Sequence, residues 1–365
     1  MEFRGRQIVR NRRTIICVIT AVLTACMFLT VLPLGAAAEE GTVYYGFGKL
    51  TEEQQTIYNS VHEGISAENP AEKIVLPADS RILPDDLKKI MKMYLADHPE
   101  TFWFDGSWGY TESGGYVMEV YPDYRLNGAA ATAEQIKDAR VAFQAKLDGI
   151  DAELKQTGLT EKKDLALWLH DETAERVSYV MNSPNSQTAY GALVDGQAVC
   201  AGYARLYQCL LQNYGIRAWT VTGSSVNPGT DRSEPHAWTL MWLGDACVYT
   251  DVTWADQDSE LYHVYYGRTL TEYADTHTPD ADIAEMLPGC TEACSDHRVY
   301  GEDNLFTGEI TAEALYGKLT ADAGGNTWTA VLYDPTGTEL NEKLNDSGFM
   351  SQLLGFMGPA AYSWE

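Results

Sequence analysis

The sequence has few basic residues. Lysine and arginine together number 26, against 52 aspartates and glutamates, and the 365-residue chain carries a formal net charge of −26 at pH 7. Residues 1–38 contain five arginines and one glutamate, so the remainder carries about −30. Such a surface repels nucleic acids and anionic membranes. We therefore expect no nucleic-acid partner, and the charge suits a protein that stays soluble outside the cell.

The N-terminal residues have the pattern of a targeting segment. Arginines between residues 4 and 13 precede an uncharged apolar run over residues 15–34, and Ala36-Ala37-Ala38 resembles a signal-peptidase site. We expect residues 1–38 to be a signal peptide and the protein to be secreted. The apolar run is also long enough to remain as a membrane anchor, and Cys26 lies in a sequence similar to a lipoprotein cleavage box. The apolar residues after Cys26 argue against lipidation, because a polar tether usually follows a lipidated cysteine.

Cysteine is scarce, and the number expected in the exported chain is odd. The five cysteines beyond residue 38 are Cys200, Cys209, Cys247, Cys290 and Cys294. An odd number leaves at least one thiol free or intermolecular. The short spacing across the Pro288-Gly289 turn favours a disulfide between Cys290 and Cys294. Together with His297 these two could instead contribute to a zinc site, although no fourth ligand is visible and we expect no metal.

The length predicts more than one domain. Without residues 1–38, roughly 327 residues remain, which is more than one hydrophobic core usually holds. We expect an N-terminal α+β region over residues 39–158, a second domain over 159–299 and a small C-terminal extension of unknown role over 300–365. Residues 326–333 of that extension have the pattern of a strand. The extension shows no repeat, low-complexity tract or cell-wall sorting signal.

Local patterns place the elements of the first two regions. A capping box at Thr51-Glu-Glu-Gln54 predicts a helix to about Gly64, and a second helix follows Pro84. Residues 102–104 and 116–121 have the pattern of strands, with aromatic side chains expected in the core. Longer helices are predicted over residues 131–157, ending at Gly158, and from about Thr160 to Val180.

Cys200 lies where a loop becomes a helix. The segment Gly196-Gln-Ala-Val-Cys200-Ala-Gly-Tyr-Ala is followed by apolar residues at helical spacing, and Gly215 is suited to end the helix. Cys200 is therefore expected in the first helical turn, where unpaired N–H groups and the helix dipole favour a thiolate. A buried cysteine that serves only in packing is the alternative.

A hairpin brings a histidine and an aspartate together. Strand patterns over residues 236–243 and 246–252 flank the two-residue turn Gly244-Asp245. If Leu243 pairs with Ala246, alternation places His236, Trp238, Tyr249 and Asp251 on one face of the sheet. His236 and Asp251 are then diagonal neighbours, with Cβ atoms about 7 Å apart. A shift of one residue would place them on opposite faces.

These three side chains have the chemistry of an activated thiol. Asp251 can accept from one imidazole nitrogen of His236, which leaves the other nitrogen to take the proton of Cys200. The resulting thiolate–imidazolium pair is a nucleophile. In the alternative interpretation His236 and Asp251 only end their strands, and spacing alone does not decide between the two.

The chain resembles the transglutaminase-like superfamily over about residues 160–275. The segment around Cys200, Pro235-His236-Ala-Trp238 and Tyr249-Thr-Asp251-Val-Thr-Trp254 are similar to the three signature blocks of that family, in the same order. The resemblance implies a papain-like α+β core over residues 159–299, with Cys200 on a helix packed against an antiparallel sheet. It also implies the roles of nucleophile for Cys200, base for His236 and orienting acceptor for Asp251.

The shared chemistry of the family is acyl transfer through a thioester. The resemblance implies a protein or peptide amide as substrate, from the cell wall or from surface proteins, with an amine or water as acceptor; the alternative is a non-catalytic binding or scaffold module at the cell surface. Tyr190 and Gln197 are candidates for the oxyanion site, and Trp238 and Trp254 for its walls. No cofactor is expected, and residues 256–260 lack the glycine and glutamate of a calcium loop.

Overall fold

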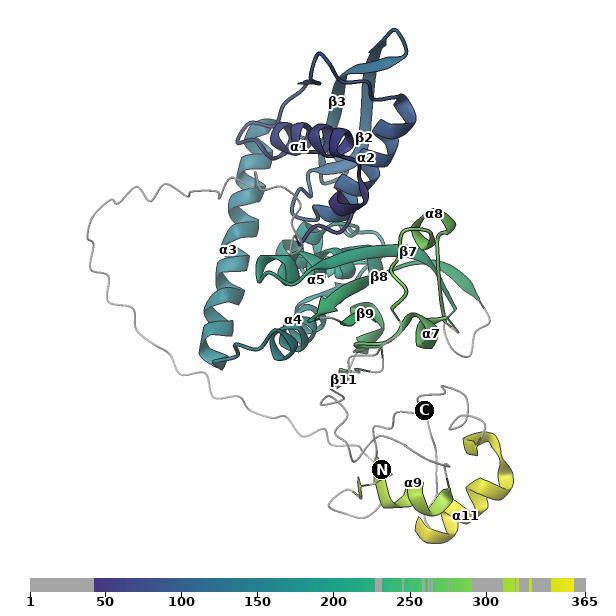
Figure 1. Cartoon of the computed structure of the whole chain (residues 1–365). Coiled ribbons are helices and arrows are strands. Elements are labelled where there is room, and N and C mark those ends of the chain that lie inside the picture. Colours follow the sequence, from purple (N-terminus) through teal and green to yellow (C-terminus); the bar gives the residue numbers. More distant parts are fainter. Residues whose placement is uncertain are drawn as a thin grey trace, which may run out of the picture. The chain divides into compact units, whose positions relative to one another are not determined.

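The computed structural model describes residues 43–226, 232–244, 246–257, 260–261, 263, 265–274, 276–290, 311–318, 320–321, 328–329 and 343–357. The expected signal peptide lies outside this part of the chain. The described residues form a mixed α+β fold with antiparallel sheets (Figure 1). The predicted α+β class is therefore confirmed, whereas the predicted domain boundaries stay a prediction.

The helical and extended elements follow one another irregularly along the chain. The helices are η1 (Phe47–Lys49), α1 (Glu52–Ser66), α2 (Pro84–Asp97), α3 (Ala133–Thr157), α4 (Lys162–Arg176), the π-helix η2 (Gly191–Asp195), α5 (Cys200–Asn213), α6 (Val252–Ala255), α7 (Leu270–Tyr273), α8 (Ala281–Ala284), α9 (Ala312–Lys318) and α11 (Ser347–Met357). The strands are β1 (Ile74–Val75), β2 (Phe104–Ser113), β3 (Tyr116–Leu126), β4 (Ala129–Ala130), β5 (Ser178–Tyr179), β6 (Gln197–Ala198), β7 (Ala218–Val226), β8 (Ser233–Leu243), β9 (Ala246–Thr250), β10 (Asp256–Gln257), β11 (Glu260–Leu261), β12 (His277–Pro279), β13 (Thr320–Ala321) and β14 (Trp328–Thr329).

The N-terminal region joins helices α1 and α2 to a sheet in the order β1-β3-β2. Helix α1 begins as predicted, because Thr51 and Gln54 form a complete capping box. The expected strand over residues 102–104 is only partly correct. Phe102 and Trp103 lie in a turn, and β2 starts at Phe104. All three rings are buried as predicted, whereas Tyr121 of β3 is 37% exposed, so the predicted core position of the aromatic side chains is correct only in part.

The two long helices that follow have well-defined ends. Helix α3 starts at a second capping box and ends before Gly158, whose φ of 72° few other residues adopt. Helix α4 is shorter than predicted, because it ends at Arg176 rather than near Val180. The backbone N–H groups of Ser178 and Val180 instead donate to the carbonyls of Gly196 and Ala198. This pairing of β5 with β6 competes with further helix.

The four-stranded sheet β12-β7-β8-β9 supports the candidate site, and its predicted register is confirmed. Leu243 pairs with Ala246, and the ladder between β8 and β9 continues to Thr239 opposite Thr250. Both faces of the sheet are buried. Ala218, Met241, Leu243 and Val248 pack with α4 and α5, whereas Trp219, Val221, Trp238, Leu240 and Tyr249 share a core with α1 and α2. Helix α5 lies against β7 and β8 (Figure 1).

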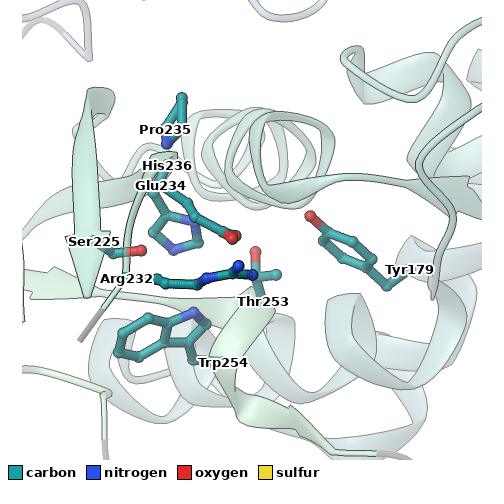
Figure 2. Close-up of a pocket in the computed structure, with 8 residues that line it drawn as sticks. All are labelled: Tyr179, Ser225, Arg232, Glu234, Pro235, His236, Thr253 and Trp254. Atoms are coloured by element: carbon teal, nitrogen blue, oxygen red, sulfur yellow. The ribbon is translucent and has the colours of Figure 1, made fainter. Parts of the chain in front are cut away.

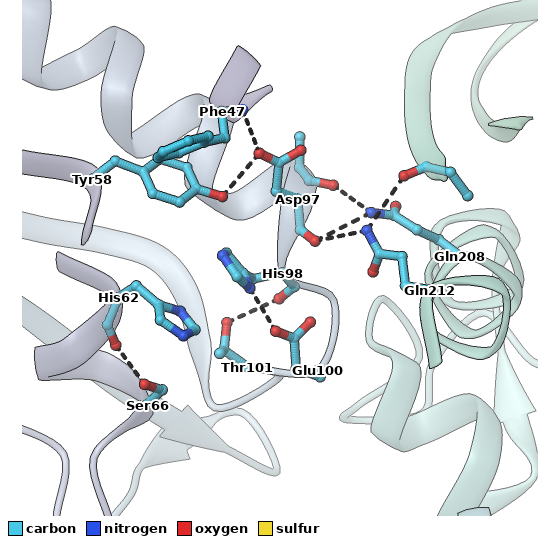
Figure 3. A network of polar contacts seen from close by, with 12 residues as sticks. Phe47, Tyr58, His62, Ser66, Asp97, His98, Glu100, Thr101, Gln208 and Gln212 are labelled. Atoms are coloured by element: carbon cyan, nitrogen blue, oxygen red, sulfur yellow. Dashed lines mark hydrogen bonds and ion pairs between the residues drawn. The ribbon is translucent and has the colours of Figure 1, made fainter. Parts of the chain in front are cut away.

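A buried polar network, which we call the joint, links the C-terminus of α2 to α5. It comprises His62, Asp97, His98, Glu100, Gln208 and Gln212 (Figure 3). The side-chain nitrogen of Gln208 donates to the carbonyl of Ala96 at 2.7 Å, and that of Gln212 donates to the carbonyl of Asp97 at 3.0 Å. The carboxylate of Asp97 accepts from the backbone of Gly46 and Phe47 and from the hydroxyl of Tyr58. The joint therefore holds α5 against the N-terminal region.

The predicted disulfide is wrong. Cys290 is bonded to Cys247 on β9, and their Cα atoms lie 5.4 Å apart. The carbonyl of Cys290 accepts from the backbone of Leu270 at the start of α7, which brings a segment distant in sequence beside β9. Proximity in sequence was therefore the wrong guide. The bond uses one of the cysteines considered for zinc, and the other, Cys294, and His297 lie outside the described residues.

The described part of the C-terminal extension has a small core of its own. Helices α9 and α11 bury Ala312, Leu315, Phe349 and Leu353 against one another. Of the strand expected over residues 326–333, Trp328 and Thr329 form β14, which pairs with β13, and the other residues lie outside the described part. Within the described residues, no helix has both the length and the apolar character needed to cross a membrane.

Candidate active site

Cys200 is the first residue of α5, as the sequence predicts. It is a free thiol with partial exposure to solvent. Gly202 lets this helix start pack closely, because a Cβ atom there would lie 2.4 Å from the carbonyl oxygen of Ser186. At the other end, Gly215 has a φ of 70° and its N–H donates to the carbonyl of Gln212, the helix end that the sequence predicts. The sulfur therefore lies at the positive end of a 14-residue helix.

His236 and Asp251 are joined by a hydrogen bond. Nε2 of His236, on β8, lies 2.7 Å from Oδ2 of Asp251, which follows β9. The other carboxylate oxygen accepts from the backbone N–H groups of Thr253 and Trp254 at 3.0 and 3.2 Å and caps α6. Because Nε2 is bound to Asp251, Nδ1 is the nitrogen left for Cys200, which is among the groups that raise the pKa of His236. The structure therefore brings the three predicted residues together.

The electrostatics of this group favour ionised side chains. Burial alone would lower the pKa of His236, but the charge of Asp251 and the hydrogen bonds to Asp251 and Cys200 raise it to about 10. Burial would raise the pKa of Asp251, but the charge and hydrogen bond of His236 hold it far below its usual range. Burial lowers the pKa of Arg205, and a negative charge on Cys200 opposes that change. The positive charges of His236 and Arg205 therefore both interact with Cys200.

A second histidine, which no sequence pattern singles out, binds the same aspartate. Nε2 of His277 lies 3.1 Å from Oδ2 of Asp251, and His277 is buried. His277 belongs to β12, a strand of three residues that pairs with the edge of β7. Neither a helical nor an alternating pattern extends over so short a strand. Only its pairing with β7 reveals that His277 reaches the site.

A pocket of about 350 Å³ opens beside His236. Its lining residues are Tyr179, Ser225, Arg232, Glu234, Pro235, His236, Thr253 and Trp254. Tyr179 stands on one side, and His236 and Trp254 lie on the other (Figure 2). Burial, and then the charges of Cys200, Glu234 and Asp251, raise the pKa of Tyr179. The pocket can therefore hold a polar substrate group beside His236 and Tyr179.

The four residues predicted to line the site occupy different places. Trp254 lines the pocket. Trp238 is buried, with its ring 4.9 Å from that of His277 and 6.2 Å from that of His236. Tyr190 packs against Phe102 in the core, with ring centroids 4.8 Å apart. Gln197 is exposed on β6 and pairs with Ser178. The pocket residues Tyr179, Ser225, Arg232, Glu234 and Thr253 were not predicted, because they come from four separate elements.

Two groups of described residues contain the side-chain types of a metal site, His236-Asp251-His277 and His170-Asp171-His263. In the first, the imidazole nitrogens lie 2.7 and 3.1 Å from one carboxylate oxygen, and in the second 2.8 and 2.7 Å. These are hydrogen-bond distances. Ligands of a tetrahedral zinc ion would lie about 3.3 Å apart. Both groups therefore fit N–H donors around an acceptor better than they fit metal ligands.

Comparison with known proteins agrees with this geometry over part of the chain. Residues 150–259, which include Cys200, His236 and Asp251, match the transglutaminase-like superfamily. A search of curated proteins finds no match. Among solved structures, a crystal structure of a TGase is similar with a TM-score of 0.29 and 11% identity, over 43% of this chain and 46% of that one. A "putative cysteine protease" from Cytophaga hutchinsonii has a TM-score of 0.26 and 19% identity, over 40% of this chain and 61% of that one.

Proposed function

We propose that this protein is a cysteine-dependent acyl transferase that acts on protein or peptide amides through a thioester on Cys200. The observation that carries the proposal is the buried hydrogen bond between His236 and Asp251 beside a pocket, with the free thiol of Cys200 acting on the same histidine. All three lie within the segment that matches the transglutaminase-like superfamily. The placement of Cys200 on a helix packed against an antiparallel sheet also supports a papain-like core.

The first half of the reaction forms the thioester. The thiolate of Cys200 adds to the carbonyl carbon of the amide, so a C–S bond forms and the carbonyl oxygen gains negative charge. The backbone N–H of Cys200 has no partner within its helix and can donate to that oxygen. As the C–N bond breaks, the imidazolium of His236 gives its proton to the leaving amine. The acyl group then remains on the sulfur.

The second half regenerates the enzyme. An amine or a water molecule attacks the thioester carbonyl while neutral His236 takes the proton of the acceptor. The C–S bond breaks and the thiolate of Cys200 returns. Transfer to an amine is transglutamination, and transfer to water is hydrolysis. The hydrogen bond to Asp251 keeps the imidazole ring in one orientation through both halves.

The location and substrate of the enzyme are also proposals. The leader pattern over residues 1–38 and the excess of acidic residues support secretion. A secreted enzyme of this kind would meet cell-wall peptides and surface proteins as its amide substrates. The polar lining of the pocket, with Ser225, Glu234 and Thr253, supports a substrate that carries polar groups near the amide.

Two cysteine variants test the proposal. Cys200→Ala should abolish both the incorporation of a fluorescent primary amine into peptides and the hydrolysis of peptide amides. Cys209→Ala, which alters the other free cysteine among the described residues, should retain activity. A comparison of amine incorporation with hydrolysis over a panel of peptides identifies the acceptor. Mass spectrometry of the protein after exposure to its substrates should find an acyl adduct on Cys200. Equal turnover in the Cys200→Ala variant and wild type would contradict the proposal. A Cys200 that neither reacts with the substrate nor carries an adduct would also contradict it and would favour a binding module.

A further inference from the structure

Asp251 is held by two imidazoles rather than one. The Nε2 atoms of His236 and His277 lie 2.7 and 3.1 Å from the same oxygen, Oδ2. The residues that match the transglutaminase-like superfamily end at 259, so the match does not account for His277. His277 is only 2% exposed and does not line the pocket. Its hydrogen bond to the site is with Asp251.

The hydrogen bonds and the burial of His277 together set its protonation. A carboxylate oxygen only accepts, so Nε2 of His277 must carry a proton. The hydroxyl of Thr276 lies 2.8 Å from Nδ1 and 3.4 Å from the carbonyl of Tyr273, and its single hydrogen can bind Nδ1 only where the ring is neutral. Burial lowers the pKa of His277, and the charges of His236 and Arg268 act in the same direction, against the hydrogen bond and charge of Asp251. The ring is therefore a neutral donor at neutral pH.

Aromatic side chains hold this ring in place. The ring centroids of Tyr273, Trp254, Trp238 and Tyr265 lie 4.4, 4.7, 4.9 and 5.9 Å from that of His277. The backbone is held as well, because His277 pairs with Ser225 of β7. A ring packed on several sides and paired through its strand keeps one rotamer. Its donor is therefore directed at Asp251 before any substrate binds.

Asp251 consequently has both oxygens fixed. Oδ1 accepts from the backbone N–H groups of Thr253 and Trp254, and Oδ2 accepts from His236 and His277. A carboxylate bound at four points cannot rotate away from its histidine. Without His277, Oδ2 would keep only the bond to His236, and the buried charge would lose a donor. The orientation of the His236 ring would then depend on a less constrained partner.

We propose that His277 is a positioning residue of the acyl-transfer site, which holds Asp251 in the orientation that Asp251 needs to orient His236. The inference rests on the proposed function. His277 contacts neither the thiol nor the substrate in this scheme. A hydrogen bond to a charged group and the tenfold rate change per 1.36 kcal/mol together predict a loss of about tenfold to hundredfold when the donor is removed.

Three variants of the full-length protein test the inference. His277→Leu removes the donor, and His277→Gln keeps an N–H near the position of Nε2. His62→Leu changes a partly buried histidine of the joint and serves as the control. The alkylation of Cys200 by iodoacetamide, followed by peptide mass mapping, requires no knowledge of the substrate. We expect His277→Leu to react about tenfold to hundredfold more slowly than wild type, His277→Gln to recover most of the rate, and His62→Leu to match wild type. With a peptide substrate the loss should fall on kcat rather than KM.

Several results would overturn the inference. One is alkylation of the His277→Leu variant at the wild-type rate across the pH range. Another is an equal loss of alkylation rate in the Leu and Gln variants together with a lower Tm, which would indicate that His277 serves packing alone. A ¹⁵N spectrum of the imidazoles gives a test independent of reactivity, because His277 must be the neutral Nε2–H tautomer. If wild-type Cys200 reacts no faster than a thiol in the unfolded chain, the proposed function fails, and the ¹⁵N spectrum still decides whether His277 binds Asp251.

Discussion

The candidate site and the joint both bring histidines and carboxylates together, and each has a free cysteine close by, Cys200 and Cys209 respectively. Only the site has the chemistry of a nucleophile. In the joint, Nδ1 of His98 lies 2.5 Å from Glu100, much as His236 lies beside Asp251 (Figure 3). Cys209 is near enough that, after burial, the charge of Glu100 raises its pKa well above the usual range. A buried histidine–carboxylate pair near a thiol is therefore not sufficient to make an active site.

The difference lies in what faces each thiol. Cys200 starts a helix, is partly exposed and is among the groups that raise the pKa of His236. Cys209 lies in the middle of the same helix and is buried, and the charge that acts on it is the carboxylate of Glu100 rather than an imidazolium. In the joint, Nε2 of His98 has no hydrogen-bond partner among the described residues. Position on the helix and the charge of the nearest group decide which cysteine can become a thiolate.

The prediction with the largest expected effect replaces one aspartate in each region with asparagine. Asp251→Asn should lower kcat by about 10²- to 10⁴-fold, because an amide can no longer accept from His236 with full charge or stabilise its cation. Asp97→Asn should leave kcat within about twofold and instead cost about 1–3 kcal/mol of unfolding free energy, because the amide loses one acceptor for Gly46, Phe47 or Tyr58. Steady-state kinetics and urea unfolding measure the two effects. A large loss of kcat in Asp97→Asn would remove the distinction between the regions.

The two regions should also lose stability at different pH. The pKa of His236 is raised from 6.5 to about 10, so the stability it contributes is fully present below pH 6.5 and is lost as the pH rises through about 10. His236→Gln removes this contribution, which is on the order of 5 kcal/mol. We expect the difference in unfolding free energy between wild type and this variant to shrink from pH 7 to pH 10. A difference that stays constant over this range would contradict a charged His236.

The sequence predicts the placement of Cys200, His236 and Asp251 because each has a local signal. Cys200 is marked by the start of an apolar period and by Gly215 at its end. The two-residue turn at Gly244 fixes the register that places His236 beside Asp251. In both cases a few consecutive residues determine the geometry. The disulfide prediction failed for the opposite reason, because Cys247 and Cys290 are 43 residues apart and meet only through tertiary packing.

His277 and the joint could not have been found in this way. Strand β12 is too short to show a period, and it reaches the site through pairing with β7. Gln208 and Gln212 look like ordinary polar residues of a helix, and only the fold buries them against the carbonyls of Ala96 and Asp97. A buried polar contact between distant elements leaves no mark on local sequence, because its partners are chosen by packing.

The joint should contain two opposing titrations at acidic pH. Burial raises the pKa of Asp97 from 3.8 to about 6, so its favourable contribution is present below pH 3.8 and is lost as the pH rises through about 6. Burial, and then the charge of His98, lower the pKa of His62 from 6.5 to about 4, so its contribution is present above pH 6.5 and is lost as the pH falls through about 4. The two changes largely cancel in the wild type.

Single variants should reveal each titration. We compare the unfolding free energy of each variant with that of wild type as the pH rises from 4 to 6.5. The difference, variant minus wild type, should increase by about 2–3 kcal/mol for Asp97→Asn and decrease by about 2–3 kcal/mol for His62→Leu. Chemical denaturation at several pH values between 4 and 7 measures both slopes. Parallel curves for the two variants and wild type would show that these groups do not titrate in the folded joint.

The smallest test compares two helix caps, one in each region. Thr51 caps α1 and Thr269 caps α7, each within a complete capping box. Replacement of either threonine by alanine should cost about 1 kcal/mol of unfolding free energy. Only Thr269→Ala should also lower kcat, by a few-fold at most, because α7 carries Tyr273, whose ring lies 4.4 Å from that of His277. If the two variants lose equal stability but only Thr269→Ala loses kcat, the site is supported by α7 and not by the N-terminal region. A matching loss of kcat in Thr51→Ala would show that the joint also controls the geometry of the site.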